Sequence, residues 1–170
     1  PIAFNHPKLN TKEFRDMIGH FGLHRPSLSD VYTNEYASAV DTFGTIAGRG
    51  LFDHFFFVEG GALGVENALK AAFDWKVRKN VEKGINKKGY QVIHMHQAFH
   101  GRSGYTLSLT NTSDPRKYMY FPKFNWPRVT TPKMTFPQTA QNIKDVEELE
   151  ARTISEIHKA LEENQNDIAA

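Results

Sequence analysis

The sequence has 170 residues and contains no cysteine, which excludes disulfides and thiolate metal sites. It also lacks any run of five basic residues, and its formal net charge is only +2. We therefore find no electrostatic signature of a nucleic-acid-binding surface, although the sequence pI is near 8.8. No apolar stretch approaches the roughly 20 residues that a membrane-spanning helix needs. We expect a cytoplasmic protein that binds neither nucleic acid nor membrane.

The hydrophobic fraction of 39% and the aromatic fraction of 12% are sufficient for a packed core in one domain. The chain begins with Pro1 rather than Met, and an apolar strand opens at its last residues. We therefore expect a piece of a longer polypeptide, with a leading segment over 1–26 and a core over 27–170. Five prolines in 111–139 forbid a long helix there and predict an ordered excursion that its aromatic residues pack.

Apolar periodicity predicts the elements of the core and gives each helix one apolar face, including a buried face on 29–47. The apolar residues of the two later helices are Val65, Leu69, Phe73 and Val77 in 62–81, and Val146, Leu149, Ile154, Ile157 and Leu161 in 146–163. Residues 5–26 are rich in turn formers. Ser27 or Ser29 is a candidate cap for the first helix, and Gly48 or Gly50 can end it. The predicted elements are a helix over 29–47, a buried strand over 52–58, a helix over 62–81, strands over 90–96 and 107–109, a helix over 146–163 and a strand opening at Ile168. Strands alternating with helices predict an α/β fold with a parallel sheet.

Gly60, Gly61 and Ala62 lie where an apolar run ends and a helix is predicted to begin. Free backbone N–H groups at a helix N-terminus attract anions, and glycines let a phosphate approach them. The pattern is neither a Walker A loop nor a good dinucleotide fingerprint. The three residues are therefore either a phosphate-binding turn or a tight strand-to-helix turn without a ligand.

The segment Phe99-His100-Gly101-Arg102 follows the predicted strand over 90–96. Ligands of open α/β sheets bind beyond the carboxyl ends of the strands, so both glycine-bearing turns would face one crevice if the strands are parallel. Phe99 could stack on a heteroaromatic ring, and Arg102 could hold a carboxylate in a bidentate pair. Otherwise Phe99 belongs to the core and Arg102 forms a surface ion pair.

Histidines at 94, 96 and 100 raise the question of a metal site, because His94 and His96 would project from one strand face. No carboxylate lies close by and no third ligand has suitable spacing, so we expect a packed strand and no metal site. We interpret Glu59 and Glu66 as structural residues, because a carboxylate aimed at a phosphate loop would repel the ligand.

The glycine turn and the Phe99–Arg102 segment together resemble the class III aminotransferases, which are pyridoxal-phosphate enzymes of fold type I. The amino-acid sequence of these segments is more similar to the lysine 6-aminotransferase branch than to the ornithine or 4-aminobutyrate relatives. The stretches that carry the resemblance are 26–33, 59–76, 98–112 and 121–128. The resemblance spans essentially the whole chain and implies part of a three-layer, mostly parallel-sheet large domain.

This resemblance implies roles for individual residues. Gly60, Gly61 and Ala62 would hold the phosphate of pyridoxal 5'-phosphate, Phe99 would stack on its pyridine ring, and His100 would also belong to the cofactor-binding residues. Arg102 would grip the α-carboxylate of L-lysine or of 2-oxoglutarate. The parent enzyme would be a homodimer. It would move the ε-amino group of lysine to 2-oxoglutarate, giving 2-aminoadipate 6-semialdehyde and glutamate.

The family's Schiff-base lysine lies downstream in its members, and no lysine of this chain sits in a matching motif. We therefore assign no catalytic residue here and expect the chain alone to be inactive. Two alternatives stay open at this point. In the first alternative, the chain is a non-catalytic α/β module that binds a phosphorylated ligand. In the second, it belongs to a class III aminotransferase that acts on another ω-amine.

Overall fold

The computed structural model describes residues 4–24 and 30–170, which divide into two compact units, 1–56 and 57–170. The first unit contains a 3-10 turn, η1 (Pro7–Leu9), and the helix α1 (Lys12–His24). Helix α1 corrects the prediction of a turn-rich segment over 5–26. Thr11 caps it by accepting a hydrogen bond from the Phe14 N–H, and Gly19 and Gly22 lie inside it rather than in turns.

The predicted helix over 29–47 is observed as α2 (Asn34–Ile46), which begins five residues later. Thr33 caps it through a hydrogen bond from the Tyr36 N–H, whereas Ser27 and Ser29 lie outside the described residues. The helix ends before Gly48, as predicted. The prediction of a buried face is wrong for this unit, because no residue of α2 is buried. The proposed division of the chain at residues 26 and 27 stays a prediction.

The predicted strand over 52–58 is not formed in the described chain, where these residues belong to no helix or strand. Phe52 and Phe56 expose 65% and 75% of their surface, so the apolar run is not a strand buried on both faces. A run of aromatics satisfies the composition of a buried strand, but a strand also needs neighbours for its backbone groups. The predicted crossover from 52–58 through a helix to 90–96 is therefore absent from these residues.

The second unit begins with α3 (Gly60–Glu82), which starts two residues before the predicted Ala62. Its predicted apolar stripe is confirmed: Leu69 and Phe73 are buried, and Val65 and Val77 are half-buried. The helix stops before Gly84, whose φ of +66° suits a residue without Cβ.

Two short strands, β1 (His94–Met95) and β2 (Arg128–Val129), pair in parallel. Residues 91 and 93 donate from their N–H groups to the carbonyls of Asp167 and Ala170, and residues 94 and 96 donate to Pro127 and Val129. The predicted strand over 90–96 is thus the middle of three parallel segments, with Ile168 bridged to Gln91 as its other neighbour. The predicted α/β class is confirmed. Strand β2, inside the Pro-rich excursion, was not predicted.

Helix α4 (Gly104–Leu109) corrects the predicted strand over 107–109. It is preceded by a capping box between Ser103 and Thr106, and it is followed by the 3-10 turn η2 (Pro115–Lys117). The alternation of apolar and polar residues in 104–109 imitates a strand. The reciprocal hydrogen bonds of the cap and the burial of four successive residues determine a helix instead.

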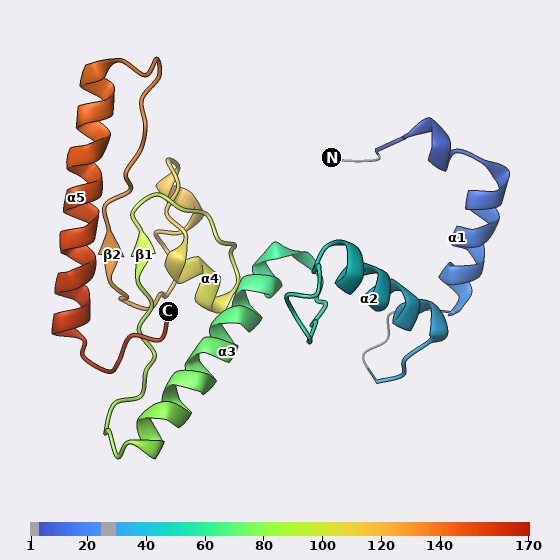
Figure 1. The fold of residues 1–170 in the computed structure, drawn as a ribbon, viewed down its shortest axis with the longest axis horizontal. Helices are drawn as coiled ribbons and strands as arrows, with labels where there is room; N and C mark the ends of the chain where they lie inside the picture. The colour runs from blue at the N-terminus through green and yellow to red at the C-terminus, as the bar shows by residue number, and fades with distance from the viewer. Residues whose placement is uncertain (1–3, 25–29) are drawn as a thin grey trace. The chain divides into compact units, whose positions relative to one another are not determined.

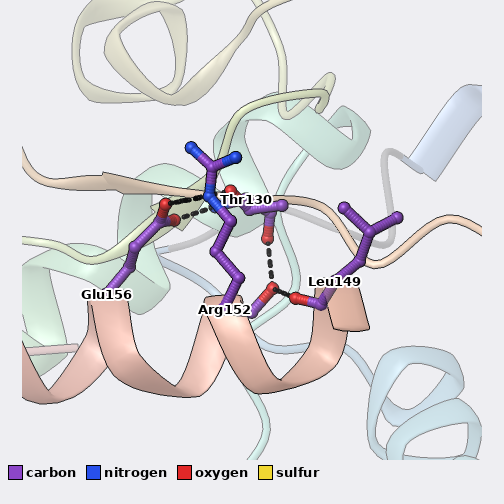
Figure 2. A network of polar contacts seen from close by, with 5 residues as sticks. Thr130, Leu149, Arg152 and Glu156 are labelled. Atoms are coloured by element: carbon purple, nitrogen blue, oxygen red, sulfur yellow. Dashed lines mark hydrogen bonds and ion pairs between the residues drawn. The ribbon is translucent and has the colours of Figure 1, made fainter. Parts of the chain in front are cut away.

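Helix α5 (Ala140–Glu163) begins six residues before the predicted start at Val146, because Thr139 caps it through the Asn142 N–H. Val146, Thr153 and Ala160 are buried, whereas the predicted core residues Ile154 and Leu161 are exposed. Figure 2 shows how α5 joins residue 130. Glu156 accepts hydrogen bonds from the Thr130 N–H at 2.6 Å, the Thr130 hydroxyl at 3.1 Å and Arg152 Nε at 2.8 Å.

The second unit has its strands between α5 on one side and α3 and α4 on the other (Figure 1). Phe73 lies at the centre of the core, with its ring centroid 5.8 Å from that of Trp126 and 5.4 Å from that of Tyr105. The core residues are Leu69, Phe73, Val92, Leu109 and Trp126. The predicted packing of the aromatic residues in the Pro-rich excursion is confirmed for Trp126 and is wrong for Tyr120, Phe121, Phe124 and Phe136, which are exposed. In residues 4–24 and 30–170, no helix combines the length and apolar character needed to cross a membrane.

Candidate active site

The N-terminus of α3 is open to an anion. Gly60 and Gly61 are its first two residues rather than a loop before it, and Gly60 has a φ of +77°. Glu59 precedes the helix but its side chain makes no capping hydrogen bond in the described chain, and the first turn carries no acidic residue. A Cβ placed on Gly60 or Gly61 would meet no described atom within 4 Å. The first-turn N–H groups are therefore accessible.

The segment from Phe99 to Arg102 connects β1 to α4, and backbone pairing closes it at its base. Ala98 and Asn111 exchange two hydrogen bonds, at 3.1 and 2.6 Å between N and O. Gly101 is buried with a φ of +128°, a conformation that favours glycine. His100 is half-buried, whereas Phe99 is 61% exposed and lines a cleft of about 510 Å³ with Gln97, Ala98, Asn111, Thr112, Ser113, Tyr118 and Lys133.

Phe99 is therefore not a core residue, and its ring is available to a planar ligand. The Arg102 guanidinium is exposed and, among the described residues, makes no hydrogen bond or ion pair. This arrangement differs from the alternative without a ligand, in which Phe99 belongs to the core and Arg102 forms a surface ion pair.

The two glycine-bearing segments touch each other. A Cβ placed on Gly101 would lie 2.6 Å from Ala62 Cβ and 2.7 Å from Thr106 Oγ1. The loop of 99–102 therefore packs on the first turn of α3, although the strand expected before α3 is absent. The structure thus brings Gly101 into contact with Ala62.

Glu66 is the residue that joins the two helices behind this contact. It is 7% exposed, and its Oε1 accepts hydrogen bonds from the N–H groups of Tyr105 at 2.8 Å and Thr106 at 3.5 Å. The carboxylate thus caps the N-terminus of α4, where a negative charge is favourable. The prediction that Glu66 is structural agrees with this geometry.

The histidines do not form a shared face. His94 is buried, and its Nδ1–H donates to the Val92 carbonyl at 3.1 Å, whereas His96 is exposed just beyond the end of β1. Burial lowers the pKa of His94 to about 4, opposed by the hydrogen bond to Val92 and assisted by the charge of Arg128. No group of three potential metal ligands occurs in the described part of the chain.

Sequence reasoning missed Thr110, whose hydroxyl contacts the 99–102 loop. No local pattern marks a threonine that follows a short helix, so only the folded loop identifies it. It also missed the cap of α4, although Ser103 and Thr106 have the spacing of a capping box.

The candidate site therefore combines an uncapped helix N-terminus with a loop that packs on it through Gly101 and carries the exposed side chains of Phe99 and Arg102. A model of the class-III aminotransferase family matches residues 5–170. The chain belongs to this family, as its resemblance predicted.

Individual members are also similar over most of the chain. L-lysine-epsilon aminotransferase of Mycobacterium tuberculosis is 46% identical over 170 residues, which cover 99% of this chain and 37% of that protein. The enzyme of the same name from Amycolatopsis lactamdurans is 53% identical over 119 residues, covering 69% of this chain and 26% of that protein.

The solved structure of lysine aminotransferase from M. tuberculosis matches with a TM-score of 0.84 and 47% identity, over 95% of this chain and 36% of that one. The chain thus spans little more than a third of the length of its M. tuberculosis relatives.

Proposed function

We propose that this chain supplies the phosphate-binding part of an L-lysine 6-aminotransferase, which moves the ε-amino group of L-lysine to 2-oxoglutarate. The observation that carries the proposal is the contact of Gly101 with Ala62, which joins the two motifs of the family in one place. The names of the similar proteins support lysine as the amino donor. The products would be 2-aminoadipate 6-semialdehyde and glutamate.

The residues of the site fit pyridoxal 5'-phosphate. The N–H groups of Gly61 and Ala62 are available at an uncapped helix N-terminus, which suits a phosphate dianion. The exposed ring of Phe99 is available to stack on a pyridine ring, and His100 flanks it. When bound, the cofactor supplies the electron sink that transamination requires.

Arg102 is the group that we assign to substrate binding. Both substrates carry at least one carboxylate. A guanidinium binds such a group through two parallel hydrogen bonds. Because Arg102 makes no competing bond among the described residues, it is free to bind one substrate after the other. Arg102 directly follows Gly101, and the contact of Gly101 with Ala62 supports a substrate-binding role near the proposed phosphate site.

The complete enzyme would be a homodimer located in the cytoplasm, and both statements stay predictions. The catalytic lysine is expected outside this chain, and none of the lysines present is assigned that role.

The experiment uses the full-length protein with pyridoxal phosphate, L-lysine and 2-oxoglutarate, and measures glutamate formation. We expect turnover with lysine, and we expect Arg102→Ala to raise KM for both carboxylate substrates with the absorbance of bound cofactor intact. Unchanged KM values in this variant would contradict the carboxylate role. Phe99→Leu should weaken cofactor retention, and retention equal to the wild type would contradict stacking.

The same assay separates the alternatives. Turnover with ornithine or 4-aminobutyrate but not with lysine would assign the site to another ω-amine. Binding of pyridoxal phosphate without transfer to any keto acid would support a non-catalytic module instead.

A further inference from the structure

Thr110 is a buried residue that no proposed step of the reaction uses. It is 1% exposed, and its hydroxyl lies between two backbone groups of the loop that carries Phe99 and Arg102. Oγ1 accepts a hydrogen bond from the His100 N–H at 3.0 Å and donates one to the Gly101 carbonyl at 2.7 Å. A single hydroxyl therefore satisfies the donor of half-buried His100 and the acceptor of buried Gly101.

The hydroxyl is presented from a rigid frame. Thr110 is the C-cap of α4, and its own N–H donates to the carbonyls of Thr106 and Leu107 at 3.1 and 3.3 Å. Its neighbour Asn111 pairs with Ala98 through two backbone hydrogen bonds, so both ends of the loop are held. The other end of α4 is fixed to α3 by the carboxylate of Glu66.

The position of Gly101 depends on this hydroxyl. Gly101 packs on Ala62 so closely that a Cβ would not fit, and its carbonyl points to Thr110. The contacts form a closed path from α3 through Glu66, α4 and Thr110 to Gly101, and back to Ala62 in α3. Movement of the loop by a fraction of an ångström would shift Phe99 and Arg102 relative to the first turn of α3.

We propose that Thr110 is a positioning residue, whose hydroxyl sets the separation between the phosphate-binding turn and the side chains of Phe99 and Arg102. The inference rests on the proposed function, because only a ligand that spans both segments makes their separation matter. A purely structural threonine would stabilise the fold without affecting that ligand.

Three variants of the full-length protein test this inference. Thr110→Val keeps the branched shape and removes the hydroxyl, and Thr110→Ser keeps the hydroxyl. The matched control is Thr153→Val, which removes a buried hydroxyl of α5 that donates to the Thr130 carbonyl at 2.9 Å. The Kd of pyridoxal phosphate is measured by fluorescence as the cofactor is titrated into the apoprotein. The exchange rate of the His100 amide proton is measured by hydrogen–deuterium exchange.

We expect Thr110→Val to raise the Kd of pyridoxal phosphate by about tenfold, the effect of losing one hydrogen bond to a buried group. The His100 amide should exchange faster, and KM for lysine and 2-oxoglutarate should rise because Arg102 is displaced. Thr110→Ser should restore all three quantities toward the wild type. Thr153→Val should lower the thermal midpoint but leave the Kd unchanged.

A folded Thr110→Val variant with the wild-type Kd would overturn the inference and leave the proposed function intact. If the wild-type protein does not bind pyridoxal phosphate, the proposed function fails, and the cofactor role of Thr110 fails with it. If Thr110→Val does not fold, Thr110→Ala and Thr110→Ser provide the comparison. A Kd that is higher in Thr110→Ala than in Thr110→Ser supports the inference, and equal Kd values in the two variants overturn it.

Discussion

Gly101 is the residue at which the site depends most directly on the absence of a side chain. Its φ of +128° disfavours an L residue, and an added Cβ would lie 2.6 Å from Ala62 Cβ. We expect Gly101→Ala to lower the free energy of unfolding by about 2–4 kcal/mol, through backbone strain and overpacking. Urea denaturation of the full-length protein measures this change.

Gly61→Ala is the matched control for Gly101→Ala. Gly61 has no positive φ, and no described atom lies within 4 Å of its Cβ position. The free energy of unfolding of Gly61→Ala should stay within about 1 kcal/mol of the wild-type value, because alanine is also the better helix former. Equal unfolding free energies for the two variants would contradict the close packing of Gly101 on Ala62.

His94 is expected to give the protein a pH-dependent stability. The pKa of His94 is lowered to about 4 in the folded chain, mainly by burial, against an ordinary value of 6.5. The unfolded state therefore binds the proton first as the pH falls, and stability should decrease between about pH 6.5 and 4, by up to about 3 kcal/mol. Above this window the imidazole is neutral in both states, so its contribution is constant.

The test compares urea midpoints at pH 7 and pH 5 for the wild type and His94→Leu. The leucine variant should lose much less stability between the two pH values. His158→Leu provides the control, because His158 is exposed on α5. A wild-type pH dependence in the His94 variant would show that other groups cause it.

At the scale of elements, α5 is anchored by one carboxylate that receives three hydrogen bonds (Figure 2). The pKa of Glu156 is lowered from 4.5 to about 2, first by the hydrogen bond from Arg152 and then by those from Thr130. We expect Glu156→Gln to lower the thermal midpoint at pH 7, because the charged acceptor is lost.

The carboxylate stabilises the fold above pH 4.5, and this contribution decreases as the pH falls toward 2. The difference between Glu156→Gln and the wild type should therefore shrink over that window. Glu148→Gln is the control, since its exposed side chain makes only a 3.8 Å pair with Lys144. Equal midpoints for the two variants would contradict the anchoring role of Glu156.

The elements also differ in how well the sequence predicts them. Helix α3 is predicted within two residues because its apolar stripe recurs at four-residue steps from Val65 to Val77. Helix α4 has only six residues, and its Leu-Ser-Leu ending alternates like a strand, so a local pattern cannot separate the two. Strand β2 has two residues and depends on its partner β1, which no nearby residue specifies. The aromatic run of 52–58 is misread because composition does not supply a neighbouring strand.

The residues of the candidate site also divide into those that local sequence predicts and those that depend on tertiary contacts. Gly60, Gly61 and the Phe99–Arg102 segment are recognisable because their residue types are tied to one conformation or chemistry. Thr110 and the cap made by Glu66 depend on contacts across ten and 39 residues, which are fixed only when α3, α4 and the loop pack together. Local sequence therefore indicates which groups could meet a ligand, and tertiary packing determines which groups hold them.

At the scale of the whole molecule, the second unit carries many large apolar side chains on its surface. Phe136 exposes 74% of its surface and Tyr120 exposes 78%. The others above half exposure are Trp75, Val81, Phe99, Phe121, Phe124 and Ile154. The chain also covers only 37% of the M. tuberculosis relative. In an isolated polypeptide, this much apolar surface favours association.

We therefore expect residues 1–170, produced alone, to associate at micromolar concentration and to bind a hydrophobic dye. Light scattering coupled to size exclusion measures the association, and the full-length protein serves as the control because its remaining residues are expected to cover part of this surface. Its dye fluorescence per residue should be lower. A monomeric 1–170 polypeptide with no more dye binding than the full-length protein would show that these side chains are covered within the chain itself.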